Sequence, residues 1–196
     1  MAQRKFFEHL ASQWDDRQPE NRREILERLL ARIDRYLLKS DRVLEVGTGT
    51  GELIPILKRR YPQIKLTSID FASAMVELAR KRQPQGGLVQ ADVHFLPFTD
   101  EKFSTVLCHN SFPHFSDKKR ALEEIKRVLV QDGFVLILHE QNRDQVNSIH
   151  SGALSKEINH DLLPSGDEIQ VLFLQAGFRI ALIEDSEDHY LVGARK

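Results

Sequence analysis

Residues 42–51 read Arg-Val-Leu-Glu-Val-Gly-Thr-Gly-Thr-Gly, and this stretch decides the fold. Its first half is a short apolar run, which is typical of a buried strand. The run leads directly into Gly47, Gly49 and Gly51. Glycine has no β-carbon, so its backbone adopts positive φ angles freely and can approach a ligand closely. Three glycines at alternate positions after a strand therefore predict a loop that holds a nucleotide.

On both sides of this loop the hydrophobic spacing alternates between the periods of strands and helices. Further strands are expected at 65–69, 87–90, 103–108 and 134–139, and helices at 52–60, 73–81, 117–129 and 166–176. Two helices are expected before the first strand, at 3–15 and from a cap at Asn21 to Leu38, and a closing β-hairpin at 178–184 and 189–194. Strands that alternate with helices form a parallel sheet covered on both faces, and ligands bind at the carboxyl ends of its strands.

The start of the helix after the loop separates two kinds of nucleotide site. A dinucleotide fingerprint requires a glycine three positions after its second glycine, where the helix packs on the strand. Here that position holds Glu52, whose bulk would crowd the contact and whose charge would repel a pyrophosphate. Asp70 ends the next strand, where its carboxylate can accept both hydroxyls of a ribose. The sequence therefore favours an adenosine ligand other than a dinucleotide.

Four segments carry a resemblance to a known family. The order acidic-x-Gly-x-Gly-x-Gly occurs over residues 45–51, and Asp70-Phe71-Ala72-Ser73-Ala74-Met75 follows at the end of the second strand. Ala91-Asp92-Val93 comes after the short third strand, and residues 123–129 lead through Asp132-Gly133 into the fifth. This arrangement resembles the class I S-adenosylmethionine-dependent methyltransferases, of the small-molecule type that is similar to methyltransferase domain 11.

The resemblance implies an α/β fold of three layers, Rossmann-like, with a mostly parallel seven-stranded sheet and helices on both faces. It implies that the glycine loop holds the methionine part of the cofactor, that Asp70 holds the ribose, and that Asp92 and Val93 hold the adenine, with Phe71 beside it. The backbone around Cys108 and His109 would close the methionine side. The cofactor-binding residues expected in this way are Glu45, Gly47, Thr48, Gly49, Gly51, Asp70, Phe71, Met75, Asp92, Val93, Cys108 and His109.

Methyl transfer from a sulfonium needs in-line positioning, and an acceptor that must lose a proton also needs a base. Histidine is the natural candidate, because its ordinary pKa lies near neutrality. His109 and His114 follow the fourth strand and His139 ends the fifth, so all three are expected at the rim of the cofactor site. We expect His109 or His139 to be the catalytic base. Alternatively His109, His114 and His139, with Glu140, could ligate a divalent metal.

Composition limits the partners. The chain has 196 residues, a formal net charge of -1 and a single cysteine, Cys108. The charge is balanced, so the sequence lacks the excess positive charge that binds nucleic acid. The lone cysteine fits a reducing compartment. No apolar run approaches the roughly 20 residues that span a bilayer, so we expect no membrane partner and a cytoplasmic location. The stretch Cys108-His109-Asn110-Ser111-Phe112 stands where amino-directed methyltransferases carry Asn/Asp-Pro-Pro-Tyr/Phe, which also disfavours nucleic-acid amines as acceptors.

The expected organisation is a single methyltransferase domain over 1–196. Residues 1–40 would form a helical cap, 41–140 the cofactor-binding core, and 141–196 a substrate-side segment with the closing hairpin. The expected function is methyl transfer to a small-molecule acceptor by a monomer or homodimer. Two alternatives are a regulator that binds S-adenosylmethionine without catalysis and a metal-assisted methyltransferase that uses the histidines. A nicotinamide-dependent oxidoreductase is a third, which Glu52 disfavours.

Overall fold

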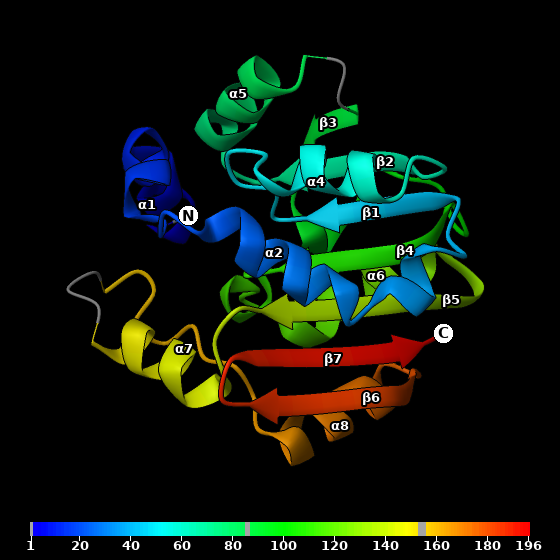
Figure 1. The fold of residues 1–196 in the computed structure, drawn as a ribbon. Coiled ribbons are helices and arrows are strands. Elements are labelled where there is room, and N and C mark those ends of the chain that lie inside the picture. Colours follow the sequence, from blue (N-terminus) through cyan, green and yellow to red (C-terminus); the bar gives the residue numbers. More distant parts are fainter. Residues whose placement is uncertain (1, 85–86, 153–155) are drawn as a thin grey trace.

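Seven strands form one sheet at the centre of the structure, a computed structural model that describes residues 2–84, 87–152 and 156–196 (Figure 1). The strands are β1 Arg42–Val46, β2 Lys65–Asp70, β3 Gly87–Gln90, β4 Phe103–His109, β5 Leu129–His139, β6 Arg179–Ser186 and β7 His189–Arg195. Their order is β3-β2-β1-β4-β5-β7-β6, and β7 runs antiparallel to both of its neighbours. The predicted mostly parallel, seven-stranded Rossmann-like sheet is therefore confirmed.

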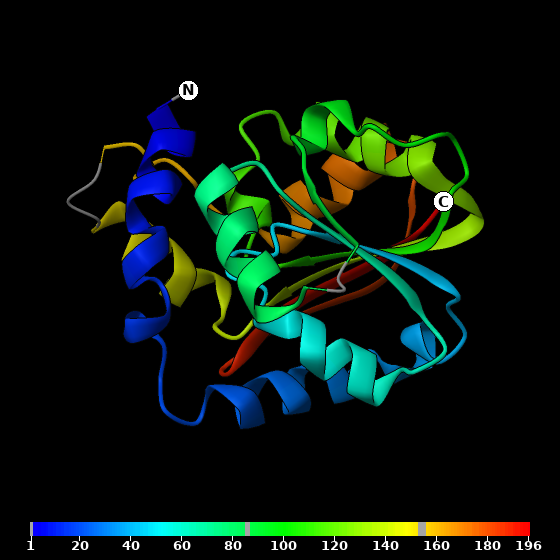
Figure 2. The ribbon, with the colours of Figure 1, turned by 90° about the horizontal axis from the view of Figure 1, so that it is seen from above.

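Helices cover both faces of the sheet. The α-helices are α1 Ala2–Leu10, α2 Arg22–Ala31, α3 Asp34–Leu37, α4 Leu53–Arg60, α5 Ser73–Arg82, α6 Lys118–Val128, α7 Arg143–Ser151 and α8 Gly166–Gln175. Short 3₁₀ turns are η1 Ala11–Gln13, η2 Asp15–Arg17, η3 Val93–Phe95 and η4 Phe112–His114. In the view from above, α2 and α4 lie on one face of the sheet and α6 and α8 on the other (Figure 2). The structure has the three layers that the sequence predicts.

Alternation along the strands explains how the sheet is buried on both sides. Val43 and Leu107 belong to a core cluster with residues of α2 and α4, whereas their chain neighbours Leu44 and Cys108 belong to a second cluster with residues of α6 and α8. Successive side chains of a strand point to opposite faces, so a strand that is apolar throughout fills both cores. All four of these side chains are fully buried.

The N-terminal helices differ from the sequence prediction. The helix expected over 3–15 ends at Leu10 and continues as two 3₁₀ turns. The second helix is broken between α2 and α3, and the residue at the break, Ile33, is fully buried in the same core cluster as Leu30 and Leu37. Asn21 stands at the expected cap position, but its side chain makes no capping hydrogen bond. The predicted single helix is therefore two shorter helices, which share one core cluster with the sheet.

The strand order reverses direction between β1 and β4, which are hydrogen-bonded neighbours although β2 and β3 come between them in the chain. Such a switch point opens a crevice at the carboxyl ends of the strands. In Figure 1, α1 and α7 lie beyond these ends, on the left of the view. Residues 153–155 of the predicted substrate-side segment, which follow α7, lie outside the described residues.

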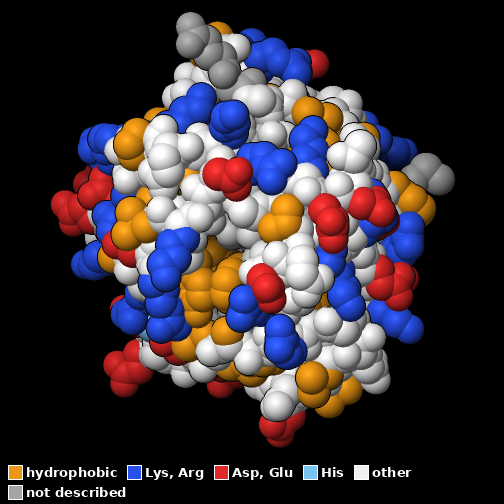
Figure 3. Space-filling view, turned by 90° about the vertical axis from the view of Figure 1, so that its right-hand side faces the viewer, with side chains coloured by type: hydrophobic (Ala, Val, Ile, Leu, Met, Phe, Trp, Pro, Cys, Tyr) orange, Lys and Arg blue, Asp and Glu red, His pale blue; other side chains and the backbone are white. Residues whose placement is uncertain are grey.

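The opposite end of the molecule, where the parallel strands begin, carries Lys and Arg interspersed with Asp and Glu around a hydrophobic patch (Figure 3). Charges of both signs are therefore mixed on this face, in keeping with the formal net charge of -1. Among the described residues, the helices are too short or too polar for any of them to cross a membrane.

Candidate active site

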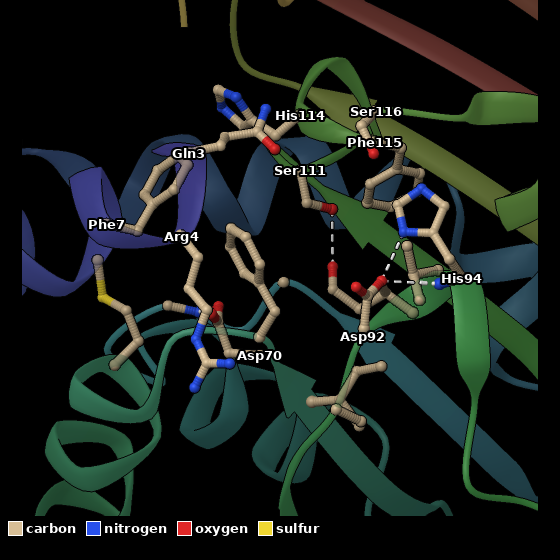
Figure 4. A pocket seen from close by; sticks show the side chains of 18 of the residues that line it. Gln3, Arg4, Phe7, Asp70, Asp92, His94, Ser111, His114, Phe115 and Ser116 are labelled. Carbon is tan, nitrogen blue, oxygen red and sulfur yellow. Dashed lines mark hydrogen bonds and ion pairs between the residues drawn. The ribbon is translucent and has the colours of Figure 1, made fainter. Parts of the chain in front are cut away.

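A cavity of about 290 Å³ lies at the carboxyl ends of β1, β2 and β4, where α1 approaches them. Its walls come from the glycine loop, the end of β2, the segment after β3, the turn after β4, and the N-terminal helix. Figure 4 shows Asp92 and His94 at one side of the cavity and Gln3, Phe7 and His114 at the other. The volume is at the lower end of the roughly 300–1,000 Å³ of small-molecule sites.

The three glycines of the loop all have positive φ, but they differ in what surrounds them. A β-carbon on Gly47, at φ +79°, would lie 2.4 Å from the Cβ of Ser111, and one on Gly51, at φ +81°, would lie 2.9 Å from the Cβ of Ala79. One on Gly49 would meet only the indole Nε1 of Trp14, at 3.8 Å. Gly47 and Gly51 therefore permit close packing of the chain, and Gly49 leaves its backbone open toward the cavity.

Asp70 ends β2 and lines the cavity, although the residue is only 6% exposed. Its Oδ2 accepts a hydrogen bond from the backbone N–H of Gly49 and its Oδ1 one from that of Ala72, each at 2.9 Å. Burial raises the pKa of Asp70 to about 6, against the lowering effect of these two bonds. Each carboxylate oxygen retains a lone pair for a further donor. Asp70 can thus accept two more hydrogen bonds from a ligand.

Glu45 does not face the cavity. The residue is 2% exposed, and its carboxylate accepts hydrogen bonds from the hydroxyls of Thr48, at 2.9 Å, and Ser68, at 2.6 Å. Burial raises its pKa above the usual value. Glu45 therefore ties the glycine loop to β2. Thr48 and Gly51, predicted to contact the cofactor, are likewise not among the described residues that line the cavity.

The segment after β3 forms the far wall of the cavity. Asp92 caps the turn η3 by accepting from the backbone N–H of His94, and its Oδ1 lies 2.5 Å from the ring Nδ1 of the same histidine. The other ring nitrogen accepts from the backbone N–H of Asp117, so the neutral ring carries its proton on Nδ1. Val93 lines the cavity beside them. The predicted Asp92 and Val93 therefore reach the site, together with His94, which the sequence did not single out.

The N-terminal segment forms one wall of the cavity and covers it on that side. Phe7 of α1 lines it and packs edge-on against Phe71, with ring centroids 5.7 Å apart. The carboxylate of Glu8 accepts hydrogen bonds from the backbone N–H groups of Ser73 and Ala74, both at 2.7 Å, and so caps α5 from another helix. Phe71 and Met75, which the resemblance implies as cofactor-binding residues, also line the cavity.

Asp15 makes a second attachment between the N-terminal segment and the glycine loop. Thr50 donates its hydroxyl proton to Asp15, at 2.7 Å, and Arg82 pairs with the same carboxylate. Trp14, the neighbour of Asp15, lines the cavity. The N-terminal segment is therefore attached to both the loop and α5.

The histidines predicted at the rim are placed differently from one another. The Nε2 of His109 lies 2.6 Å from the Oε1 of Glu140, which also pairs with Arg22. His139 is 2% exposed, its Nε2 has no hydrogen-bond partner among the described residues, and burial holds its pKa well below the usual value. Neither is among the described residues that line the cavity, whereas His114 is.

Among the described residues, His109 contacts Glu140, but the predicted metal ligands do not form one group. Within residues 2–84, 87–152 and 156–196, no group of three or more His, Cys, Asp or Glu side chains is placed to hold a metal ion. Cys108 is fully buried in β4, and burial raises the pKa of its thiol. It belongs to the core and does not line the cavity.

Several cavity residues were not predicted from the sequence. Ser111 sits against Gly47 and donates its hydroxyl proton to the backbone oxygen of Val46, at 2.7 Å, as Figure 4 shows. Gln3 and Arg4 reach the cavity from α1. These contacts join segments far apart in the chain, so no local pattern indicates them. The aromatic spacing of the N-terminal helix is the one sequence signal of this cover.

Residues 44–137 match a family model described as a methyltransferase domain. The demethylmenaquinone methyltransferase of Thermotoga maritima is 40% identical over 98 residues, which cover 50% of this chain and 43% of that relative. The malonyl-(acyl-carrier protein) O-methyltransferase of Geobacter sulfurreducens is 29% identical over 179 residues, covering 85% and 66%. The chain thus spans less than half the length of the first of these relatives.

A solved structure of an S-adenosylmethionine-dependent methyltransferase from Aquifex aeolicus superimposes with a TM-score of 0.72, at 21% identity, over 94% of this chain and 97% of that one. At this identity the likeness concerns the fold. Residues 44–137 therefore carry a methyltransferase domain, and the chain as a whole has the fold of that S-adenosylmethionine-dependent methyltransferase.

Proposed function

We propose that the cavity binds S-adenosylmethionine and that the protein transfers its methyl group to a small acceptor. The position of the Asp70 carboxylate in the cavity is the main support for this proposal. Two backbone N–H groups hold this buried carboxylate at the end of β2, with lone pairs left on both oxygens. Two neighbouring ribose hydroxyls are the donors that suit such a carboxylate.

The rest of the cavity fits the other parts of the donor. Asp92 can accept the amino group of the adenine, and the apolar side chains of Phe71, Met75 and Val93 can flank the ring. The backbone at Gly47 and Gly49 faces the methionine part. When bound, the sulfonium supplies a methyl group that is already an electrophile. The protein then has to orient the acceptor and exclude water.

The size and cover of the site favour a small acceptor. The cavity of about 290 Å³ must hold the donor as well, and side chains of α1 form part of its wall. The relatives named above act on demethylmenaquinone and on a malonyl-carrier protein, so both quinol-like and acyl groups are acceptors to try. We propose that residues 1–40 serve as the cap over the acceptor, 41–140 as the donor-binding core and 141–196 as the acceptor side, in one cytoplasmic domain that acts as a monomer or homodimer.

Trp14 gives a direct binding assay. It is the only tryptophan of the chain and it lines the cavity, so its fluorescence should change when S-adenosylmethionine binds. Asp70→Ala should abolish this change, whereas the exposed Asp167→Ala on α8 should leave it intact. Retained tight binding by Asp70→Ala would contradict the proposed site.

Release of S-adenosylhomocysteine with candidate acceptors then tests catalysis. Release in the presence of EDTA supports methyl transfer without a metal, and loss of release that added Mg²⁺ or Zn²⁺ restores would favour the metal-assisted alternative. Binding with no release from any acceptor would favour a regulator. Binding of NAD in place of S-adenosylmethionine would favour an oxidoreductase.

A further inference from the structure

Three distant segments meet at one carboxylate beside the cavity. Asp161 comes from the segment after α7, His114 from η4 and Gln3 from α1. The Oδ2 of Asp161 lies 2.7 Å from the Nδ1 of His114 and 2.6 Å from the Nε2 of Gln3. The side chains of Asp161 and His114 are each only 14% exposed. The carboxylate therefore holds the histidine in one orientation at the cavity wall.

The hydrogen bond with Asp161 determines which ring nitrogen of His114 has no proton. An ionised carboxylate only accepts hydrogen bonds, so the neutral imidazole must carry its proton on Nδ1. Nε2 then has a lone pair, and no hydrogen bond to this atom occurs among the described residues. His114 lines the cavity, so this basic nitrogen belongs to a residue that a ligand can reach.

Two aromatic rings pack against the ring of His114. Phe7 packs edge-on against its ring, with centroids 4.9 Å apart, and the ring of His150 lies at the same distance on another side. The Nδ1 of His150 donates to the backbone oxygen of Asp161, and burial lowers the pKa of His150. The lowered pKa of His150 favours its uncharged form beside His114. Lys118 donates to the backbone of the η4 turn and holds it in place.

We propose that His114 is the general base of the methyl transfer, with Asp161 as its positioning residue, and that the acceptor is a small aromatic hydroxyl compound. This inference rests on the proposed function. The hydroxyl oxygen attacks the methyl carbon while the bond from that carbon to sulfur breaks, and its electron pair stays on sulfur. The hydroxyl proton passes to Nε2 of His114. The resulting imidazolium, stabilised by Asp161, later loses the proton to water, which leaves a methyl ether and S-adenosylhomocysteine.

A histidine base favours acceptors whose hydroxyl is weakly acidic. A phenol has a pKa of about 10, like tyrosine, and imidazole at about 6.5 can take its proton as the new bond forms. A thiol, at about 8.5, is already partly ionised near neutrality and gains less from a base. Phe7, whose ring packs against His114, and Phe115, which also lines the cavity, suit a flat ring.

A series of substituted phenols with graded acidity tests the base directly. His114→Gln should lower kcat by about 10²–10⁴-fold on weakly acidic phenols. It should lower kcat far less on a nitrophenol that is already ionised at the assay pH. Binding of S-adenosylhomocysteine, followed by Trp14 fluorescence, should stay within about twofold of the wild type. His160→Gln, at an exposed histidine of the same segment, is the matched control and should change neither quantity.

A readout that needs no turnover tests the role of Asp161. Nitrogen-15 NMR of the free protein should show His114 with its proton on Nδ1, and Asp161→Asn should redistribute the proton between the two nitrogens. In the same variant the pH profile of kcat should shift to lower pH, because the imidazolium loses its negative partner.

Equal losses by His114→Gln on weak and ionised phenols would overturn the inference, as would a proton on Nε2 in the wild type, or turnover of amines or thiols but of no phenol. Failure of the proposed function has a different signature. The wild type would then not bind S-adenosylmethionine, or would release no S-adenosylhomocysteine with any acceptor, whatever the tautomer of His114.

Discussion

Protonation of Asp70 should weaken donor binding at mildly acidic pH. Burial raises the pKa of this carboxyl to about 6, so it gains a proton in a range where the protein can be studied. Both oxygens already accept a backbone N–H group. A protonated oxygen would point a hydrogen at one of these donors or at a ribose hydroxyl. Only the ionised form should therefore bind well.

The size of the effect follows from the ionised fraction. One unit below a pKa of about 6, at pH 5, about a tenth of Asp70 is ionised, so the apparent dissociation constant should be about tenfold higher than at pH 8. Binding weakens as the pH falls, because the ligand prefers the ionised form of Asp70. Binding lowers the pKa of Asp70, and protons are released on binding as the pH falls through about 6.

Calorimetric titration with S-adenosylhomocysteine between pH 5 and 8, at constant ionic strength, measures both quantities. Titrations in two buffers with different heats of ionisation give the number of protons released. Asp70→Asn should bind weakly, with no dependence on pH over this range. A wild-type dissociation constant that stays within twofold from pH 5 to 8, or the same pH dependence in Asp70→Asn, would refute this account of the ribose site.

Three further predictions concern the framework of the site. Gly47→Ala should lower the free energy of unfolding by about 2–4 kcal/mol in chemical denaturation, because its β-carbon would overlap that of Ser111 at a positive φ; an unchanged stability would contradict the packing described here. Glu8→Ala should remove the cap of α5, at about 0.5–2 kcal/mol, and speed hydrogen exchange in α1 and α5 but not in α8. Cys108 should react with a thiol reagent only after unfolding, since burial raises its pKa; rapid labelling of the native protein would show that β4 is accessible.

The sequence predicted those parts of the site that depend on order along the chain. The stretch 42–51 combines a strand with a loop that only glycine fits, and Asp70 and Asp92 follow the next two strands. Because parallel strands place their carboxyl ends at one edge, these residues meet without any information on packing. The structure brings Asp70 and Asp92 to the same cavity.

What the sequence could not show is where side chains point after a strand ends. His109 and His114 are five positions apart, yet His109 pairs with Glu140, whereas the turn η4 brings His114 to the cavity wall. The partner of His114, Asp161, lies after one further strand and two further helices. The direction of the Glu45 side chain could not be predicted either. The resemblance implies that it binds the cofactor, but its carboxylate accepts hydrogen bonds from hydroxyls of the loop and of β2.

A crystal structure of the protein with S-adenosylhomocysteine tests the central claim most directly. We predict that both ribose hydroxyls donate to Asp70, that the adenine lies beside Asp92 and Val93, and that the sulfur faces the side of the cavity formed by Ser111 and His114. A ligand bound elsewhere, or bound in this cavity with its ribose away from Asp70, would contradict it.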